Sequence, residues 1–393
     1  MKVLMVNNRL KVYGGEGTYM TSVGDELIRQ GHDVQYFGLI DDDGLHGNKY
    51  GIYAKKSVNP FKLRENRYNR KQFAKILDCF HPDIIHLNLY YFTLTPSILL
   101  EAKKREIPVI QTVHDGKIIC PSYQLFVSNQ GRACTDCLDG YFNRCVANKC
   151  HKNSKLFSLI AYNEATYNRR KGYYNLVNLF VFPSEFMRNL HVKSGIAEER
   201  TTVLCNFSRI KKRTELYKSN QRYVLFFGRV IKIKGVDVLA KVVDLLPHVK
   251  FKIVGEGDQT YLFHNKTNCE LLGFKSGAEL EQLIAGAVCS VFPSVCYENC
   301  PMSIQESIAL GTPAIGSNIG GIPELISEGK TGYIVNGMDE KELAGRIDEV
   351  WNDPALSLYM AKNCIHDSQL MDVTDYVAKL ECIYEGLLQK TNE

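Results

Sequence analysis

The feature that most constrains the fold of this chain is a repeated alternation of short apolar runs with longer amphipathic stretches. Twelve runs have the length and composition of buried β-strands, namely 2–7, 33–39, 82–88, 108–113, 178–184, 201–206, 223–228, 249–255, 269–274, 289–294, 312–317 and 331–336. Continuous apolar strands that are each followed by a helix predict parallel sheets covered by helices on both faces.

The alternation starts afresh near residue 222, after the polar and basic stretch 208–220, which has the composition of an interdomain linker. We therefore expect an α/β protein with two doubly wound, Rossmann-like domains that face a cleft, spanning 1–207 and 208–370. A final helix over 371–393 is expected to pack back on the first domain. In such sheets, ligands bind at the carboxyl ends of the strands.

Composition narrows the class of protein. The net charge of +5 is mild, and no recognition motif indicates a nucleic-acid partner. The first residues, MKVLMVN, have the pattern of a strand rather than of an export signal, and no run of about 18 apolar residues indicates a membrane span. Thirteen scattered cysteines without an export signal favour a reducing, cytoplasmic setting.

Two cations follow the first strand of the second half, in GRVIKIKG (228–235). Gly228 permits a tight turn at the end of the strand, and Arg229 and Lys234 then lie at the carboxyl edge of the sheet. Two fixed cations suit a diphosphate, which gains charge when it leaves in a reaction. The alternative is that both are solvated surface residues at the start of a helix.

Two glutamates lie eight positions apart in YENCPMSIQES (297–307). Pro301 is expected at the first helical position, which leaves Glu298 in the loop above the sheet edge. Glu306 is expected inside the helix, opposite the apolar Ile304 and Ile308 and able to reach back toward the ligand. One carboxylate suits the hydroxyls of a ribose and the other a sugar. The alternative is a helix-capping glutamate and an exposed one.

These motifs resemble those of the family 4 retaining glycosyltransferases, which have the GT-B fold. ENCPMSIQE resembles the E-x7-E signature of that family, GRVIKIKG resembles its G-R-x4-K-G motif, and 310–336 resembles the segment that follows the signature. The resemblance implies that Arg229 and Lys234 hold the nucleotide diphosphate. It also implies that Glu306 binds the ribose hydroxyls and that Glu298 contacts the donor sugar.

The resemblance implies further donor-binding positions. The backbone at Pro301, Met302 and Ser303 would lie near the sugar and phosphate. Two pairs of glycines complete the expected donor site: Gly320 and Gly321 in the turn that approaches it, and Gly255 and Gly257 in the nucleotide pocket.

The first half has its own candidate residues at strand ends. Gly14, Gly15 and Gly17 open a helix, and glycines at a helix start let a phosphate come close. The stretch resembles the G-G-x-G-T-Y start of the same family, which lies near donor diphosphate and acceptor. QTVHD resembles the family's T-x-H-D, which implies that His114 is a catalytic residue contacting the sugar. Asp115 is expected to orient His114 and fix its tautomer.

Cysteines cluster in an insertion near 120–151. The spacing C-x2-C-x7-C-x4-C of Cys134, Cys137, Cys145 and Cys150 fits a tetrahedral structural zinc ion, with Cys120 and His151 as substitutes. The alternatives are unpaired thiols in a loop or reversible disulfides.

A basic stretch, 55–75, carries eight Lys or Arg, one Glu and the aromatic residues Phe61, Tyr68 and Phe73. It is expected to dock on an anionic membrane surface, with 169–171 as an extension. The alternative is an ordinary solvated helix face.

Taken with these features, the resemblance implies a hexosyltransferase that moves a sugar from a UDP- or GDP-sugar to a glycan or lipid-linked acceptor in polysaccharide biosynthesis. The resemblance implies retention of configuration. No catalytic metal is expected, because two cations and a helix end already suit the diphosphate. The expected location is cytoplasmic, including a peripheral position at the inner face of the membrane. The alternatives are a catalytically silent GT-B subunit that binds a glycan or partner, and a sugar-nucleotide epimerase or hydrolase.

Overall fold

The structure is a computed structural model that describes residues 1–10, 14–40, 47–56, 63–208, 210–217, 221–366 and 371–392. The chain divides into two compact units. The first comprises Met1–Asn129, Cys134–Cys205 and the segment from Val373 onward, and the second is built mainly from Asn206–Asp372.

The first unit contains a six-stranded sheet in the order β2-β1-β3-β4-β7-β8, and the pairings are parallel. Its strands are β1 Lys2–Arg9, β2 Asp33–Leu39, β3 Ile84–Leu87, β4 Val109–Thr112, β7 Leu179–Phe182 and β8 Thr201–Val203. Its helices are α1 Gly14–Arg29, α2 Arg67–Phe80, α3 Leu99–Lys103, α4 Asn143–Ala147, α5 Lys155–Arg170, α6 Glu185–Lys193 and α12 Val373–Asn392.

The second unit repeats the plan, with the strand order β11-β10-β9-β12-β13-β14 and parallel pairings. Its strands are β9 Val224–Phe227, β10 Phe251–Val254, β11 Cys269–Gly273, β12 Cys289–Phe292, β13 Ala314–Ser317 and β14 Gly332–Val335. Its helices are α7 Val236–Leu245, α8 Gly277–Ala285, α9 Met302–Ala309, α10 Glu340–Asn352 and α11 Pro354–His366.

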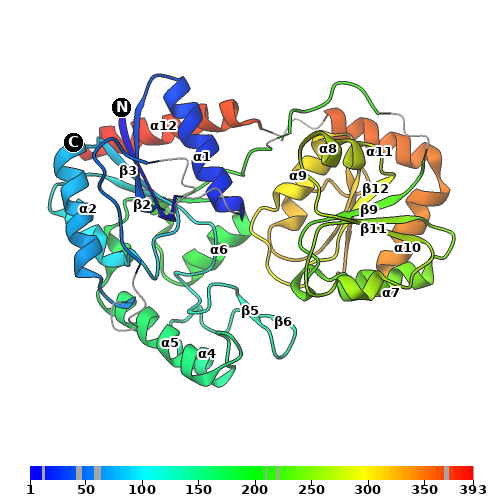
Figure 1. The fold of residues 1–393 in the computed structure, drawn as a ribbon, viewed down its shortest axis with the longest axis horizontal. Helices are drawn as coiled ribbons and strands as arrows, with labels where there is room; N and C mark the ends of the chain where they lie inside the picture. Colours follow the sequence, from blue (N-terminus) through cyan, green and yellow to red (C-terminus); the bar gives the residue numbers. More distant parts are fainter. Residues whose placement is uncertain are drawn as a thin grey trace. The chain divides into compact units, whose positions relative to one another are not determined.

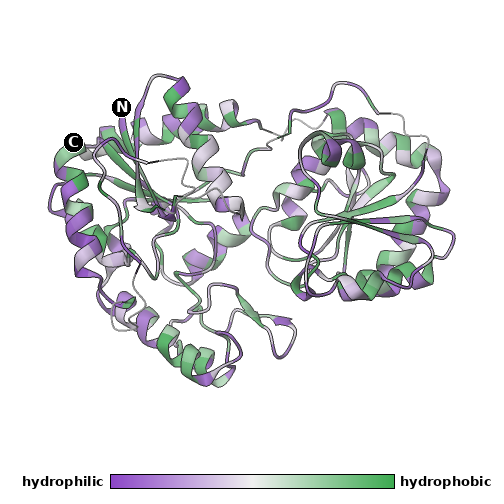
Figure 2. Cartoon of the chain, viewed as in Figure 1, coloured by the Kyte–Doolittle hydropathy of each residue, from purple (hydrophilic) through white to green (hydrophobic). Residues whose placement is uncertain are grey.

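The predicted fold class is confirmed, because all twelve apolar runs form strands of two parallel α/β sheets. β9, β12 and β13 are buried at every residue, which is why their sequences are continuously apolar rather than alternating. Figure 2 shows these strands as apolar segments inside each unit, with polar residues on the outer helices. β5 Phe126–Val127 and β6 Arg132–Ala133 form a separate two-stranded sheet.

The C-terminal helix α12 belongs to the first unit and runs against α1 (Figure 1). Tyr376 and Tyr384 on this helix are fully buried. The hydroxyl of Tyr376 hydrogen-bonds the hydroxyl of Tyr19 on α1 at 2.7 Å. Helix α12 therefore contributes side chains to the core of the first unit.

No helix in the described part of the chain is both long and apolar enough to span a bilayer.

Candidate functional site

The loop after β9 places two cations at the carboxyl edge of the second sheet. Gly228 has a φ of 149° and donates its N–H to Val254 O at 3.0 Å, which turns the chain directly behind the strand. Arg229 is exposed, and Lys234 ends a short 3₁₀ turn, Lys232–Lys234. Gly235 follows with a φ of 68°, and a Cβ there would lie 1.7 Å from Pro293 O. Only glycine fits at this position.

Lys234 and Glu298 form an ion pair at this edge. The Nζ of Lys234 lies 2.5 Å from Oε1 of Glu298, and Ser294 Oγ donates to the same oxygen at 2.9 Å. Burial opposes ionisation of Glu298, but Lys234, Ser294 and Arg229 outweigh it, so the pKa of Glu298 lies below its usual range. Glu298 is therefore ionised at neutral pH, and its charge partly neutralises Lys234.

Helix α9 begins beside this pair. Pro301 is its N-cap, with ψ at 114°, and Met302 is the first helical residue, so the prediction that Pro301 takes the first helical position is wrong by one residue. No described side chain caps this end of α9. The first N–H groups of the helix are therefore available to an anion.

These groups surround one cavity of about 210 Å³. Its polar lining comes from three segments of the second unit and comprises Arg229, Lys234, Ser294, Glu298 and Ser303. Pro301 also lines it, whereas Met302, Gly255, Gly257 and Glu306 do not. Glu306 lies on α9 with 6% of its surface exposed. The structure thus brings together both cations and one of the two glutamates.

Glycines fix the backbone around Glu298. Gly320 has a φ of 63°, and a Cβ on it would lie 2.3 Å from Glu298 O and 2.6 Å from Glu298 N. The N–H of Gly321 donates to Glu298 O at 2.7 Å. This turn therefore holds the glutamate loop through backbone contacts that leave no room for a side chain.

The other predicted glycine pair supports the cation loop. A Cβ on Gly255 would lie 1.8 Å from Gly228 O, and one on Gly257 would lie 2.1 Å from Val230 O. These residues let the loop after β10 pack on the loop that carries Arg229.

In the first unit, His114 follows β4 and is partly buried. Its Nε2 lies 2.8 Å from Asn88 Oδ1, while the amide nitrogen of Asn88 faces Val6 O. Nε2 therefore carries the proton, and Nδ1 keeps a lone pair. Burial lowers the pKa of His114 to about 4, so the ring is neutral near pH 7.

Asn88 holds His114, rather than the predicted Asp115. The Asp115 carboxylate accepts the backbone N–H of Lys117 at 2.9 Å instead, and burial raises its pKa to about 6. Asn88 follows β3 at the same sheet edge, so a polar residue directly after a buried strand was the signal that could have identified it.

Tyr19 on α1 supports the histidine from the other side. Its ring packs edge-on against His114 with the centroids 4.8 Å apart. Its hydroxyl lies 3.0 Å from Thr112 Oγ1 and also contacts Tyr376. His114 is therefore positioned by α1 and, through Tyr376, by α12.

The predicted glycine start of α1 is Gly14, Gly15 and Gly17. A Cβ on Gly15 would meet no heavy atom within 4 Å. Packing within the described structure therefore does not require glycine at position 15.

The four predicted zinc ligands lie together in the first unit, with Cys120 beside them. None of these five cysteines is in a disulfide bond. Among the described residues, no group of three or more His, Cys, Asp or Glu side chains is arranged to hold a metal ion.

The predicted basic surface is only partly as expected. Phe61 lies outside the described residues, and Tyr68 is exposed. Phe73 is buried in the core of the first unit, 5.1 Å from the ring of Phe37, so its predicted place on a surface is wrong.

Family models match both halves of the chain. "Glycosyltransferase Family 4" matches residues 13–208, and "Glycosyl transferases group 1" matches residues 208–367. With the two parallel six-stranded sheets, these matches define a GT-B glycosyltransferase. The chain belongs to glycosyltransferase family 4.

Two curated relatives span most of the chain. An uncharacterized glycosyltransferase of Methanocaldococcus jannaschii, MJ1607, is 24% identical and covers 96% of each chain. The alpha-monoglucosyldiacylglycerol synthase of Streptococcus pneumoniae is 24% identical over 85% of this chain and 74% of the relative.

Solved structures share the fold. Anabaena Alr3699/HepE in complex with UDP and glucose has a TM-score of 0.66 at 19% identity, covering 98% of this chain and 99% of that one. The lipopolysaccharide outer core galactosyltransferase WaaB has a TM-score of 0.68 at 16% identity, covering 98% and 100%. At these identities the likeness shows the fold alone.

Proposed function

We propose that this protein transfers a sugar from a nucleotide-diphosphate sugar to an acceptor hydroxyl, with retention of configuration. The observation that carries the proposal is the cavity in which Arg229, Lys234, Glu298 and the start of α9 meet. Two cations and free helix N–H groups suit a diphosphate. The structural relative that contains UDP and glucose supports a UDP-sugar as the first donor to test, ahead of a GDP-sugar.

The diphosphate is the leaving group in this reaction, and it gains negative charge as the bond to the sugar breaks. Arg229, Lys234 and the N–H groups of Met302 and Ser303 are assigned to that charge. These groups supply the stabilisation without a catalytic metal. Glu298 is assigned to the hydroxyls of the donor sugar. Glu306 is assigned to the ribose, where a carboxylate accepts from both hydroxyls of the diol.

His114 is assigned to the donor sugar from the first unit. Its neutral ring offers Nδ1 as an acceptor for a sugar hydroxyl, because Nε2 is committed to Asn88. The glycine start of α1 is assigned to the same reaction, near diphosphate and acceptor. The acceptor hydroxyl attacks the sugar on the face from which the diphosphate leaves, and its proton passes to an oxygen of the departing diphosphate. Glu298 and the departing diphosphate stabilise the positively charged sugar between them.

A lipid-linked acceptor in polysaccharide biosynthesis fits a second surface of the first unit. Tyr141, Leu156, Phe157 and Leu159 are all exposed around α4 and α5. Residues 140–163 contain one arginine, three lysines and no acidic residue. Exposed apolar side chains with a basic rim suit the interface of an anionic bilayer. The synthase and galactosyltransferase relatives, named for a diacylglycerol and a lipopolysaccharide product, support such an acceptor.

A donor panel tests the proposal. Wild-type protein and Glu306→Ala are heated with UDP- and GDP-sugars, and the unfolding temperature is followed. One donor should stabilise the wild type, and the variant should lose that effect. Nucleotide release should then require an acceptor. Release without an acceptor would indicate a hydrolase, and stabilisation by no donor would indicate a silent subunit.

Vesicle binding tests the lipid surface. Leu156→Ser with Phe157→Ser should lose sedimentation with anionic phosphatidylglycerol vesicles. Leu358→Ser is a matched control, because Leu358 is 48% exposed on α11 of the second unit. Equal sedimentation of wild type and double variant would contradict a membrane surface at α5.

A further inference from the structure

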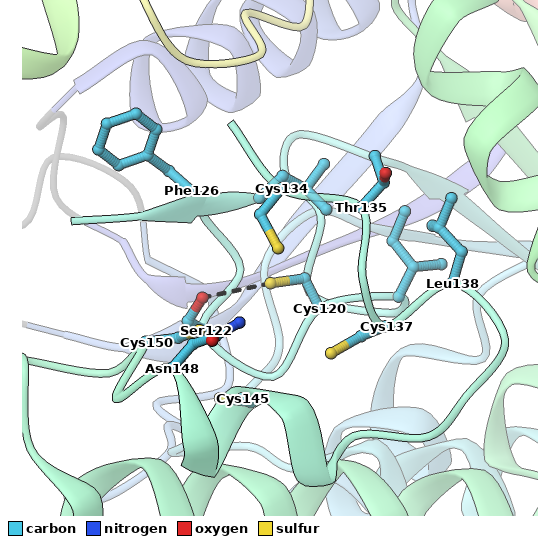
Figure 3. A pocket seen from close by; sticks show the side chains of 12 residues that line it. Cys120, Ser122, Phe126, Cys134, Thr135, Cys137, Leu138, Cys145, Asn148 and Cys150 are labelled. Atoms are coloured by element: carbon cyan, nitrogen blue, oxygen red, sulfur yellow. Dashed lines mark hydrogen bonds between the residues drawn. The ribbon is translucent and has the colours of Figure 1, made fainter. Parts of the chain in front are cut away.

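Five cysteines of the first unit line one small cavity of about 10 Å³. Cys120 comes from the loop after β4, Cys134 and Cys137 follow β6, Cys145 lies in α4, and Cys150 follows that helix. Figure 3 shows the sulfur atoms of Cys120, Cys134 and Cys137 around a shared space. About 10–15 Å³ holds one water molecule, so the cavity has room for a single small ion.

The buried cluster around this cavity consists mainly of cysteines. Its buried cluster contains seven residues, of which four are cysteines; the others are Val127, Phe142 and Ala165. The regular structure between residues 116 and 154 amounts to the two-residue strands β5 and β6 and the five-residue helix α4. A segment with so little regular structure gains stability from a cross-link or a metal that holds one conformation.

The backbone of the insertion is also strained. Five non-glycine residues between 123 and 153 have positive φ, namely Tyr123, Leu125, Lys149, Lys152 and Asn153. Such conformations persist when the surrounding structure holds them in place. The cysteines that line the cavity are placed to supply part of that restraint.

The five thiols differ in their hydrogen-bond partners. Cys134 and Cys137 are three positions apart in a C-x2-C turn, and a side-chain hydrogen bond joins Cys145 and Cys150. The sulfur of Cys120 is instead held by Ser122 Oγ at 3.2 Å and by backbone N–H groups of Ser122 and Leu125.

We propose that Cys134, Cys137, Cys145 and Cys150 bind one structural Zn²⁺ as a closed tetrathiolate site. Because no described group of three ligands is arranged for a metal ion as placed, the thiol side chains must turn inward when the ion binds. On binding, four thiols release their protons to water and four Zn–S bonds form. Cys120 remains a hydrogen-bonded thiol beside the site. The ion has no role in sugar transfer.

Metal content of the full chain, purified from zinc-replete cells without chelator, tests the proposal. The wild type should carry about one Zn²⁺ per chain, and replacement by Co²⁺ should give the visible absorption of a tetrahedral thiolate site. Cys134→Ser and Cys145→Ser should each lose most of the metal. Cys120→Ser and Cys269→Ser should keep it, since Cys269 lies on β11 of the second unit.

A second measurement separates loss of metal from loss of folding. The single tryptophan, Trp351, lies on α10 of the second unit, so its emission shows whether that unit remains folded when metal is removed by a chelator. The zinc-free chain should become sensitive to protease within 120–154 and regain resistance when Zn²⁺ returns. A metal-free wild type with all its thiols titratable would overturn the proposal, as would full metal content in Cys134→Ser.

Discussion

The contact between Lys234 and Glu298 shapes the chemistry of the second-unit cavity. A partly buried ion pair such as this one stabilises little on balance, because desolvation offsets the attraction between its charges. Here Glu298 keeps Lys234 oriented and reduces the positive charge that the cavity presents before a ligand binds. In the proposed function, an incoming diphosphate competes with Glu298 for the ammonium group, and release of Glu298 would free a carboxylate for the donor sugar.

Glu298→Gln should separate binding from turnover. Without the carboxylate, Lys234 is free to donate to phosphate, so nucleoside-diphosphate affinity should rise by up to roughly tenfold. The turnover rate should fall by about 100-fold or more, because the charge facing the sugar is lost. Titration calorimetry and a transfer assay measure the two effects. Glu279→Gln, at an exposed pair with Lys275, is the control. Weaker diphosphate binding in Glu298→Gln would contradict this role.

Gly320→Ala should displace the glutamate loop. The new Cβ would meet the backbone of Glu298, so the second unit should lose about 2–3 kcal/mol of unfolding free energy together with donor binding. Gly329→Ala is the matched control, because its φ of 70° imposes similar strain while a Cβ there meets nothing within 4 Å. It should cost about 1 kcal/mol and keep donor binding. Urea unfolding measures the loss of stability in each variant. Equal losses in Gly320→Ala and Gly329→Ala would rule out the contact with Glu298 as the cause.

Among the elements, strands were predictable and side-chain partners were not. Continuous apolar runs such as β9 and β12 require burial on both faces, which leaves little choice of structure. Arg229, Lys234 and Glu298 come together because strand ends meet at one sheet edge. Tyr19 and Tyr376 lie 357 residues apart, and no local pattern links them. The φ of Pro301, −67°, suits both an N-cap position and the first helical position. Only its ψ distinguishes these two positions.

The apolar stripe on α2 is a sequence pattern that predicts burial. Phe73, Ile76, Leu77 and Phe80 are buried at helical spacing, which marks a core face rather than a docking surface. The same reasoning does not identify the apolar residues of α5 as exposed, because a core stripe and an exposed patch have the same composition. Only the fold separates them.

Removing the Tyr376 hydroxyl tests the link between α12 and the His114 site. Tyr376→Phe should lower the stability of the first unit by about 1–2 kcal/mol, since a buried hydrogen bond with Tyr19 is lost. It should also reduce turnover more than donor affinity, because Tyr19 packs against His114. Tyr359→Phe, 51% exposed on α11, is the control. Unchanged turnover in Tyr376→Phe would limit α12 to a structural role.

At the scale of the whole molecule, the two units differ in their buried histidines. Burial lowers the pKa of His86 to about 3 and those of His114 and His191 to about 4, and all three lie in the first unit. An unfolded histidine titrates near 6.5, so the unfolded state binds more protons below that pH. These groups contribute stability above about pH 6.5, and that stability is lost as the pH falls toward 4. Asp115 opposes part of this loss, since its pKa is raised to about 6.

The first unit should therefore be the acid-sensitive one. Two thermal midpoints are compared between pH 7.5 and 5. The midpoint of the earliest loss of far-ultraviolet circular dichroism should fall as the pH is lowered. The midpoint of Trp351 emission, which reports on the second unit, should change less. His191→Gln should reduce the shift, whereas His264→Gln, at an exposed position in the second unit, should not. Parallel shifts of both signals would contradict this assignment.

The domain boundaries at residues 207 and 370 stay predictions. Expressing the two segments separately would test them.

The cavity around Arg229 is proposed to bind the diphosphate of a sugar nucleotide, and calorimetric titration with UDP and uridine, repeated with GDP and guanosine, measures that binding. The wild type should bind one diphosphate at least about tenfold more tightly than its nucleoside, and Arg229→Gln should lose about that factor for the diphosphate alone. Lys250→Gln, at an exposed lysine of the same unit, should bind like the wild type. Two results would contradict diphosphate binding in this cavity. One is equal diphosphate affinity in wild type and Arg229→Gln, and the other is no preference for diphosphate over nucleoside.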